Sequence, residues 1–371
     1  MNLDFLLGTG VGAVAGVVVE RLVGLPIDRL TSLTHRNLRK HQRQRIAAKV
    51  AANKRLLDIG GELVYVHTFT PLGLEITTSW DSHVDMQSQK MFLLKNRTIN
   101  RELIESIDVE EITRAIESKR QELQDSDTEW NEQKVGLSRA GFKNDIQQSI
   151  PVLSLAFHRS DYAASVVMEQ LWRENTNPDY LHQQDDNFLY SPLSIYSQNF
   201  GVNATVLTDD GRILLVHRSA RTSSERDRTH ISVNEGVVPS DSKAGTIDPK
   251  YALKRGIEEE LGVKDIDDAS ITFHSLILDA TRYQWALLGH VDLSGTGIDE
   301  AKFRTARNSC AATDHWENDD IRFIEASWPS IRDALADKES WIAHGWLNLL
   351  YSGLLMFPHR KEEILQMLSE R

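Results

Sequence analysis

The sequence contains a single cysteine, Cys310, among its 371 residues. It can therefore form neither an internal disulfide framework nor a cysteine-rich zinc site, and it fits a reducing compartment. With 40% apolar and 26% charged residues, the composition also excludes a wholly disordered chain, a collagen-like chain and a multi-span membrane protein. The length predicts two domains, or three if a small helical one is counted.

Basic residues are outnumbered by acidic ones and are unevenly placed. The chain has 42 lysines and arginines against 54 aspartates and glutamates, which gives a net charge of −12. Nine of the basic residues lie within residues 29–57, which contain no acidic residue. An acidic body with one short basic segment is not the pattern of a protein that coats nucleic acid, so we expect no nucleic-acid partner.

The longest run without a charge near the N-terminus is shorter than a membrane span. Residues 5–19 read FLLGTGVGAVAGVVV, fifteen positions, whereas a helix needs roughly 20 residues to cross a bilayer. The run reaches that length only if residues 22–27 are added. Within it, Gly8, Gly12 and Gly16 recur every four residues, a spacing that lets helices approach closely in lipid.

The order of the apolar run and the basic residues predicts an anchor. A cleavable secretory signal carries its basic residues before the apolar run, whereas here they follow it. Basic residues after the run suit a single anchor whose C-terminal side is cytoplasmic and touches anionic headgroups. We therefore predict a membrane anchor over residues 1–27, contact with membrane lipids, a basic juxtamembrane helix over residues 28–57, and a homo-oligomer through the glycine-stepped face.

Three other interpretations of the N-terminal run stay open. The run could be a buried core helix, or a peripheral amphipathic helix of a cytoplasmic protein. The string GTGVGA at residues 8–13 could also open a dinucleotide-binding unit. That unit requires a strand before the glycines and a second strand some 20 residues later, and the segment that follows here is polar, basic and helical in character.

Residues 58–180 have the mixed pattern of a small α+β domain. Its β-type runs, its amphipathic helix and its second strand–helix pair occupy residues 62–69, 73–80, 91–96, 101–124, 151–157 and 160–174. Residues 173–187 are polar and have the composition of a linker. The histidines of this domain are isolated in the sequence, so no ligand is predicted for it.

A hairpin and a well-delimited helix follow in the second half of the chain. Two apolar runs within residues 200–218 flank the turn DDG at residues 209–211, and Asp-Gly between such runs is a strong hairpin signal. The helix begins after Asp248, a good N-cap, with Pro249 at its first position, and Gly262 lies just past its end.

The predicted helix has an apolar stripe and a charged face. The stripe, which faces a core, consists of Leu253, Ile257 and Leu261. On the charged face, Glu259 and Glu260 lie side by side, with Arg255 one turn below. Paired carboxylates supply the hard oxygen ligands that Mg²⁺ prefers, and Mg²⁺ in turn binds substrate phosphates.

These residues resemble the core of the Nudix box, whose pattern ends in R-E-U-x-E-E-x-G-U with U aliphatic. The segment RGIEEELGV matches it in register at Arg255, Ile257, Glu259, Glu260, Gly262 and Val263. The upstream hairpin and the downstream segment DHWENDDIRFIEASWPSIRDAL extend the resemblance over residues 196–335.

The resemblance implies an α/β fold class. We expect a Nudix-like α/β/α sandwich over residues 196–335, preceded by the small α+β domain and the N-terminal membrane-anchor helix, and followed by a helical tail over residues 336–371. Within the tail, residues 341–357 are apolar but contain His344 and Asn348. They therefore predict a packing helix rather than a second membrane span.

The resemblance also implies roles for the site residues. Glu259 and Glu260 would hold Mg²⁺ or Mn²⁺, and Arg255 would orient them through its i,i+4 contact with Glu259. The region of Gly236 would supply a backbone carbonyl. The metals would hold the pyrophosphate of a nucleoside diphosphate linked to another group, and an activated water would attack phosphorus.

Three positions depart from the family pattern. Gly256 stands where the family has its second box glutamate, Asp241 where it has the box glycine, and Ile247 where it has the earlier glutamate. Gly236 is the substitute for the box glycine. We expect a side chain at position 256 to project into the metal site.

A catalytic base would then have to come from elsewhere in the chain. The candidates are Glu317, in the acidic segment DHWENDD, and Glu235. Glu235 and Gly236 are also expected to bind the substrate, and arginines of the loop after the hairpin would clamp phosphates as bidentate donors. These arginines are Arg218, Arg221, Arg226 and Arg228.

Three functional hypotheses follow. The first is a membrane-tethered, Mg²⁺-dependent hydrolase of a nucleotide-type small molecule. The alternative is a Nudix-fold module that has lost the base and binds a nucleotide or a protein signal. The third is a Nudix-fold isomerase acting on an isoprenyl diphosphate, whose usual reactive cysteine has no counterpart around residues 232–234.

Overall fold

The computed structural model describes residues 56–81, 85–96, 101–126, 131–143, 150–176, 193–220, 226–309, 312–313 and 318–369. The predicted anchor and nearly all of the predicted basic helix lie outside these ranges. Among the helices within them, none combines the length and the apolar character needed to cross a membrane.

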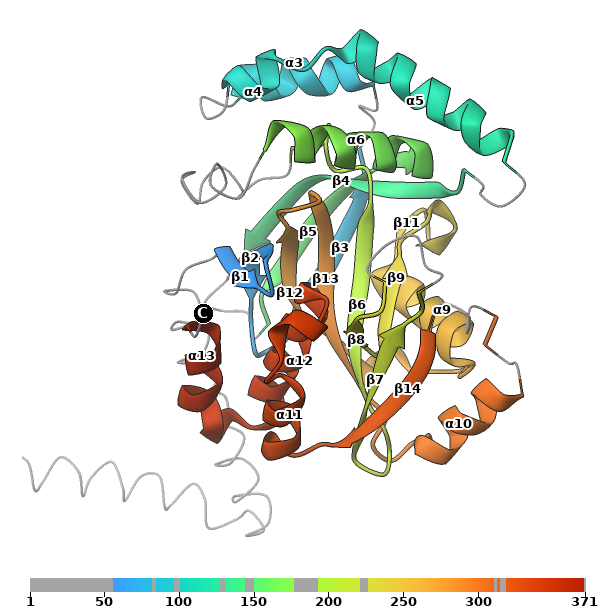
Figure 1. Ribbon diagram of the computed structural model, residues 1–371, viewed down its shortest axis with the longest axis vertical. Helices are drawn as coiled ribbons and strands as arrows, with labels where there is room; N and C mark the ends of the chain where they lie inside the picture. The colour runs from blue at the N-terminus through green and yellow to red at the C-terminus, as the bar shows by residue number, and fades with distance from the viewer. Residues whose placement is uncertain are drawn as a thin grey trace, which may run out of the picture.

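A large mixed sheet forms the centre of the fold (Figure 1). Its strand order is β1-β2-β12-β13-β6-β7-β14, with β9 paired to β6 and β8 paired to β7. β13 runs parallel to β6, and the other pairs are antiparallel. The strands are β1 (Leu56–Ile59), β2 (Glu62–Phe69), β6 (Phe200–Leu207), β7 (Arg212–Arg218), β8 (Thr229–Ile231), β9 (Val233–Gly236), β12 (Ile271–Asp279), β13 (Gln284–Asp292) and β14 (Asn318–Glu325).

Helices cover both faces of this sheet. Along β7, Leu214 and Val216 belong to one hydrophobic cluster, whereas Ile213 and Leu215 belong to a second cluster. Because successive side chains of a strand point to opposite faces, the two clusters lie on opposite sides of the sheet. The first cluster includes helix α9, and the second includes the C-terminal helices. The predicted layering of helix, sheet and helix is therefore present.

The local elements of the second half agree with the sequence. β6 and β7 form the predicted hairpin, and Gly211 takes the left-handed conformation, with φ 73°, that its turn requires. Helix α9 (Pro249–Leu261) starts after Asp248 and ends at Gly262, whose φ is 72°. The side chains of its predicted stripe are buried. Helix α10 (Glu300–Asn308) precedes β14.

The C-terminal helices pack on the second face of the sheet. They are α11 (Trp328–Ala334), α12 (Ala343–Met356) and α13 (Lys361–Ser369). Every residue of α12 from Ala343 to Leu354 is buried. The prediction of a packing helix at this place is confirmed.

A second sheet has the order β3-β5-β4 and is covered by the remaining helices. In Figure 1, helices α3 to α5 form the top layer, above α6. The elements are β3 (Glu75–Trp80), α3 (Met86–Asn96), α4 (Arg101–Glu105), α5 (Val109–Gln124), β4 (Gln133–Lys143), β5 (Val152–Asp161) and α6 (Tyr162–Asn175). The pair β10 (Ser242–Lys243) and β11 (Thr246–Ile247) forms a separate ribbon before α9.

The two sheets share one core. Phe157 on β5 and Phe200 on β6 pack edge to face, with ring centroids 4.9 Å apart. Trp172 on α6 donates its indole N–H to the carbonyl oxygen of Ala280, at 2.7 Å, in the turn between β12 and β13. Within the segment expected to form a small α+β domain, β2 also pairs with β12 of the large sheet. The segment therefore shares its core with the second half of the chain.

The strand predicted at residues 91–96 is wrong, because these residues belong to helix α3. Asp85 accepts the backbone N–H of Ser88 at 2.7 Å, which is the hydrogen bond of a helix N-cap. Leu93 is buried while Met91 is largely exposed. A short apolar run is compatible with a half-buried helix as well as with a strand. Here the N-cap at Asp85, upstream of the run, identifies it as part of a helix.

Candidate functional site

Arg255 lies at the centre of the predicted motif and contacts three carboxylates. Its Nε and Nη2 donate to the two oxygens of Asp241, each at 2.9 Å. Its Nη1 donates to Glu259 at 2.9 Å and lies 3.1 Å from Oε1 of Glu235. Its Nη2 also donates to the carbonyl oxygen of Gly236 at 2.8 Å. The expected contact with Glu259 is present, and the carbonyl that the resemblance offers to a metal is bound by Arg255.

Asp241 fixes the position of this arginine. Its side chain is fully buried, and its Oδ2 also accepts the backbone N–H of Val238 at 2.9 Å. A buried carboxylate requires a charged partner, which Arg255 supplies with a bidentate pair. Burial lowers the pKa of Arg255, but the hydrogen bond to Asp241 and the charges of the three carboxylates raise it above its ordinary value, so the guanidinium stays charged.

Glu260 faces the strands rather than the charged face of α9. The residue is only 4% exposed. Its Oε1 accepts the backbone N–H of Asn234 at 3.2 Å, and its Oε2 accepts the side-chain amide of Asn318 at 3.3 Å. Glu259 instead lies half-buried beside Arg255. The helix therefore turns its two neighbouring carboxylates into different surroundings.

Gly256 allows strand β9 to approach helix α9 closely. A Cβ atom at this position would lie 2.7 Å from the Cβ of Glu235 and 3.0 Å from both its Cγ and the Cγ1 of Val233. The expectation that a side chain here would project into a metal site is therefore wrong. The space is filled by the stem of Glu235, which brings its own carboxylate to Arg255.

Glu235 has the most perturbed carboxyl group of this cluster. Burial raises the pKa of Glu235 to about 7, and the charge of Glu259 adds to the rise, while Arg255 and Lys134 oppose it. A carboxyl group that titrates near neutral pH is suited to acid–base chemistry.

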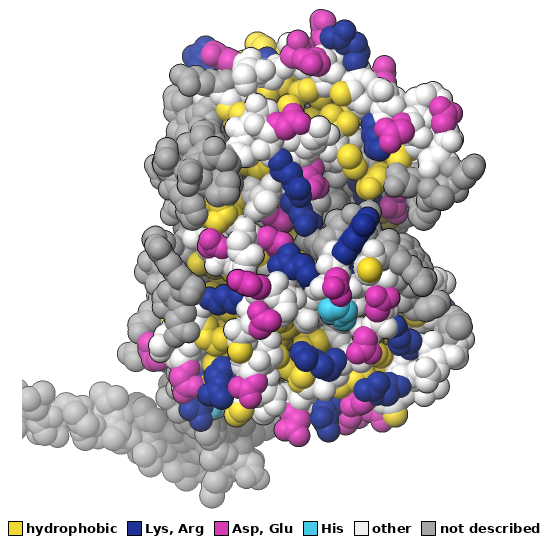
Figure 2. Space-filling model, viewed as in Figure 1, with side chains coloured by type: hydrophobic (Ala, Val, Ile, Leu, Met, Phe, Trp, Pro, Cys, Tyr) yellow, Lys and Arg dark blue, Asp and Glu magenta, His cyan; other side chains and the backbone are white. Residues whose placement is uncertain are grey.

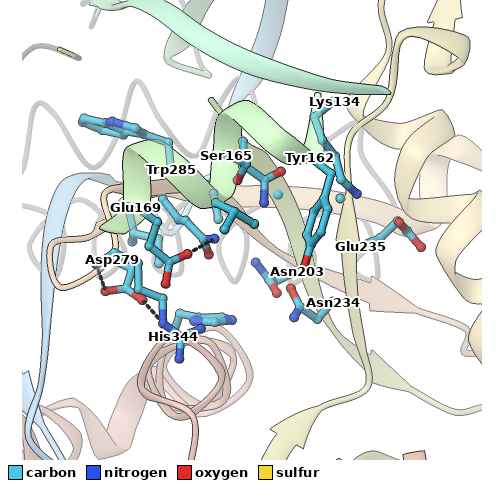
Figure 3. Close-up of a pocket in the computed structure, with 18 of the residues that line it drawn as sticks. Lys134, Tyr162, Ser165, Glu169, Asn203, Asn234, Glu235, Asp279, Trp285 and His344 are labelled. Atoms are coloured by element: carbon cyan, nitrogen blue, oxygen red, sulfur yellow. Dashed lines mark hydrogen bonds and ion pairs between the residues drawn. The ribbon is translucent and has the colours of Figure 1, made fainter. Parts of the chain in front are cut away.

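A cavity of about 630 Å³ lies next to this cluster, between α6 and the large sheet (Figure 3). Arg218, Glu235 and Gly236, which the sequence predicts to bind substrate, all line it. Arg221 and Glu317 lie outside the described residues. Other lining residues, which the sequence did not indicate, include Lys134, Tyr162, Glu169, Arg173, Glu174, Asn199, Asn203, Asn234, Asp279, Arg282, Gln284, Trp285 and His344.

Several polar side chains of the lining have a buried hydrogen-bonding atom without a partner among the described residues. They include the Oδ1 atom of Asn203 and the indole N–H of Trp285, in residues that are 1% and 0% exposed. Buried polar atoms are almost always hydrogen-bonded, and leaving one unpaired costs about 1–3 kcal/mol. A polar ligand that reaches these two atoms from the cavity would supply the missing donor and acceptor.

The other two arginines of the predicted clamp do not line the cavity. Arg228 binds Glu62 and the carbonyl oxygen of Trp341. Glu62 also accepts the backbone N–H of Ala343, at 3.1 Å, at the start of α12. Arg228 therefore attaches the helix to the sheet, and Arg226 lies on the surface.

The carboxylates described here do not form a ready Mg²⁺ site. Glu235 and Glu259 are directed at Arg255, and both oxygens of Glu260 accept hydrogen bonds from Asn234 and Asn318. In the part of the chain that the structure covers, no three His, Cys, Asp or Glu side chains are grouped to hold a metal. The donor atoms in this arrangement therefore do not fit the ion that the sequence resemblance implies.

Comparison with known proteins finds weak structural similarity only. No family model and no curated protein matches the chain. Among solved structures, DR0079 from Deinococcus radiodurans is similar with a TM-score of 0.28 and 18% identity, covering 42% of this chain and 82% of that chain. A mutT/nudix family protein from Listeria innocua has a TM-score of 0.28 and 15% identity, covering 45% and 97% of the two chains.

Proposed function

We propose that this chain binds a nucleotide-type small molecule in the cavity between α6 and the large sheet, and that helix α9 supports one wall of the site, strand β9, through the contacts of Arg255 and Glu260. The observation that carries this proposal is the cavity itself, which is lined by the predicted residues Arg218, Glu235 and Gly236. Its volume of about 630 Å³ falls in the usual range of ligand sites, roughly 300–1,000 Å³. Asn203 and Trp285, two residues of its lining, each have an unpaired polar atom.

The contacts of α9 favour binding over metal-dependent hydrolysis. For Glu259 to coordinate Mg²⁺, it would have to leave Arg255, and Glu260 would have to give up both of its hydrogen bonds. Arg255 could not follow Glu259 without leaving the buried carboxylate of Asp241 unpaired. We therefore interpret the ion pairs and hydrogen bonds of the charged side chains of α9 as contacts that hold the helix in place.

Calorimetric titration of the full chain with nucleosides and nucleoside mono-, di- and triphosphates, in the presence of a chelator, tests this proposal. We expect binding of at least one compound without divalent metal, and stabilisation against heat that grows with its concentration. Asn203→Leu should weaken that binding by about tenfold, the equivalent of about 1.4 kcal/mol. Absence of binding by every compound, with and without Mg²⁺, would contradict the proposal.

Thr205→Val is the matched control for Asn203→Leu. Thr205 lies two residues further along β6, is fully buried and also has an unpartnered side-chain oxygen, but it does not line the cavity. Each variant replaces a buried polar group by an apolar group of similar shape, so both should leave the fold at least as stable. Only the variant in the cavity should change affinity.

A second candidate function is a Mg²⁺-dependent hydrolase of a nucleoside diphosphate derivative. It is favoured by Glu235, which lines the cavity, shares Arg255 with Glu259 and has a pKa raised by burial to about 7. If this function holds, phosphate or monophosphate is released only with Mg²⁺ or Mn²⁺, and Glu235→Gln lowers turnover by roughly 10²–10⁴-fold. If the chain only binds its ligand, wild type releases neither product.

Membrane attachment through residues 1–27 is a further part of the proposal. Its support is the glycine-stepped apolar run followed by nine basic residues, which would place the remainder of the chain in the cytoplasm and allow self-association in lipid. We expect the full chain to sediment with membranes, and a chain starting at residue 58 to stay in the supernatant. Release by high salt alone would show electrostatic, peripheral binding instead.

A further inference from the structure

The charged side chains that line the cavity are balanced in number, with four basic and four acidic residues. They are Lys134, Arg173, Arg218 and Arg282 against Glu169, Glu174, Glu235 and Asp279. Basic and acidic side chains are interspersed in the same way on the face of the molecule shown in Figure 2. The charge of a ligand therefore does not decide how it lies in the cavity, and the hydrogen-bond donors and acceptors of the lining have to be considered one by one.

His344 is the lining residue whose position is most closely determined by its partners. Its Nε2, in the first turn of α12, lies 2.9 Å from Nε2 of His230 on β8. The start of the helix is attached to that strand, because the backbone N–H of Ile342 donates to the carbonyl oxygen of Thr229 at 3.0 Å. Gly345 leaves room for the second ring, since a Cβ atom there would lie only 3.2 Å from Cδ2 of His230. The helix and the strand therefore set the distance between the two imidazoles.

The protons of this histidine pair follow from their hydrogen bonds. Nδ1 of His230 donates to the carbonyl oxygen of Ile231 at 3.1 Å, because a carbonyl oxygen can only accept. His230 is completely buried, where a charged ring is unfavourable, and a neutral imidazole has one protonated nitrogen. Its Nε2 is therefore the acceptor. The proton between the two rings then belongs to Nε2 of His344, which leaves a lone pair on Nδ1 of His344.

This lone pair of His344 is accessible from the cavity. Burial and the positive charges of three arginines lower the pKa of His344 to about 3, so the ring is neutral at physiological pH. Among the residues that the structure describes, none forms a hydrogen bond with its Nδ1. The atom is not enclosed, unlike the unpaired atoms of Asn203 and Trp285. His344 lines the cavity and is 8% exposed, so a ligand there meets an acceptor.

We propose that His344 is a neutral hydrogen-bond acceptor for the ligand, with Nε2–H donated to His230 and the Nδ1 lone pair directed at a hydroxyl or amino group. This inference rests on the proposed function and places the nucleoside part of the ligand against α12. A phosphate dianion offers only acceptor oxygens and does not match this nitrogen, whereas sugar hydroxyls and base amino groups do. His230 is a positioning residue, because it determines which nitrogen of His344 carries the proton.

Calorimetry on the full chain, in a chelator, tests the acceptor with nucleosides that lack one donor. The probes are the four common ribonucleosides, their 2′-deoxy and 3′-deoxy analogues, and purine riboside and inosine, which lack the amino group of adenosine and of guanosine. In wild type, loss of the donor that meets His344 should weaken binding by about tenfold. The analogue that shows this loss identifies the donor as a sugar hydroxyl or a base amino group.

Variants of His344 show whether that loss depends on this residue. His344→Phe keeps a ring but has no acceptor, so it should bind the parent nucleoside and the analogue equally. His344→Gln keeps an acceptor oxygen and should retain part of the difference. Equal weakening of the parent and of every analogue in His344→Phe would overturn the acceptor role, and so would a wild type that binds every analogue as tightly as its parent.

The tautomer of His344 is tested without any ligand. A long-range ¹H–¹⁵N spectrum of the full chain with labelled histidines distinguishes a protonated ring nitrogen from a bare one, and His344→Phe assigns the signals. We expect the proton of His344 on Nε2, and a change in the ratio of the two tautomers in His230→Phe, which removes the acceptor. A wild-type spectrum with the proton on Nδ1 would overturn the proposal, whatever the variants do.

Ser352→Ala is the matched control. Ser352 lies about two turns further along α12, is fully buried and has a hydroxyl without a partner among the described residues, but it does not line the cavity. This substitution should leave the affinities and the tautomer of His344 unchanged. A change of either would trace the effect to the packing of α12 and overturn the acceptor role. Failure of all compounds to bind would overturn the proposed function as well.

Discussion

Gly256 shows how one missing side chain sets the distance between a helix and a strand. Glycine inside a helix costs about 1 kcal/mol relative to alanine, so Gly256→Ala would stabilise an exposed helix. Here the new methyl group would meet Glu235 at 2.7 Å, and overpacking of this kind costs about 1–3 kcal/mol. We expect Gly256→Ala to lower the free energy of unfolding in a urea titration, and Gly256→Glu to lower it more.

Gly353→Ala is the control for that measurement. Gly353 also lies inside a buried helix, α12, but a Cβ atom there would meet its nearest neighbour, Trp328, at the ordinary distance of 3.5 Å. This substitution should be neutral or stabilising by up to about 1 kcal/mol. A stabilising Gly256→Ala would mean that β9 and α9 are not in close contact.

Arg255 provides a second prediction at the level of single residues. Removal of one partner from a buried ion pair costs about 3–5 kcal/mol, because the other charge stays buried without compensation. Arg255→Met leaves the fully buried Asp241 in that situation. We expect a loss of this size in chemical denaturation, and recovery of most of it in the double variant Arg255→Met, Asp241→Leu. An Arg255→Met protein as stable as wild type would exclude a structural role for this arginine.

The sequence predicts the contacts of a single residue only where they depend on nearby positions in the chain. Arg255 and Glu259 were placed together by their i,i+4 spacing, and their contact is 2.9 Å in the structure. Asn203 and Trp285 could not be recognised, because an asparagine or tryptophan in an apolar strand gives no sign of which face of the sheet it occupies. Asp241 was noticed only as a departure from a pattern, and its pairing with Arg255 depends on how the loop before α9 folds.

At the scale of elements, helix α9 was predictable because its limits are encoded within its own residues. Asp248 accepts the backbone N–H groups of Lys250 at 3.0 Å and of Tyr251 at 3.4 Å. Helix α3 was missed, since its apolar run resembles a strand until the cap at Asp85 is considered. Caps and left-handed glycines are local signals, whereas the choice between a buried strand and a half-buried helix depends on what packs against it.

The cap of α9 gives a prediction of its own. Asp248→Ala removes the acceptor for two backbone donors and should lower the free energy of unfolding by about 1 kcal/mol. Asp248→Asn keeps a capping oxygen and should lose much less. Guanidinium denaturation of the three proteins measures the difference. Equal stability of the alanine variant and wild type would show that the packing of this helix, rather than its cap, holds its start in place.

At the scale of the whole molecule, the sequence predicts the layers of the fold but not which strands pair with each other. The alternation of strands and helices indicates an α/β/α arrangement, yet nothing local indicates that β2 pairs with β12 or that β13 lies parallel to β6. The cavity depends on these long-range choices, since α6 covers the sheet only because the first half of the chain shares its core. The residues that line the cavity could therefore not be predicted from a sequence motif.

Buried histidines predict how the whole molecule responds to acid. Burial lowers the pKa of His274 and of His344 to about 3, and that of His158 to about 4. Unfolding returns each to the ordinary value of 6.5, so below that pH the unfolded chain binds more protons than the folded one. The contribution of these histidines to the free energy of unfolding is complete above pH 6.5. As the pH drops towards 4, it falls by about 1.4 kcal/mol per pH unit for each such histidine.

Glu235 acts in the opposite direction and allows the two effects to be separated. Its pKa is raised from 4.5 to about 7 in the folded chain, so its contribution is complete below pH 4.5 and is lost as the pH rises through 7. Denaturant titrations between pH 4 and pH 8 should therefore show a steep loss on the acid side, made shallower by Glu235. His274→Gln should reduce the acid-side slope by about 1.4 kcal/mol per pH unit, whereas the exposed His359→Gln should not change it. An acid-side slope unaffected by His274→Gln would mean that this histidine is already charged in the fold, which its complete burial in the core makes unfavourable.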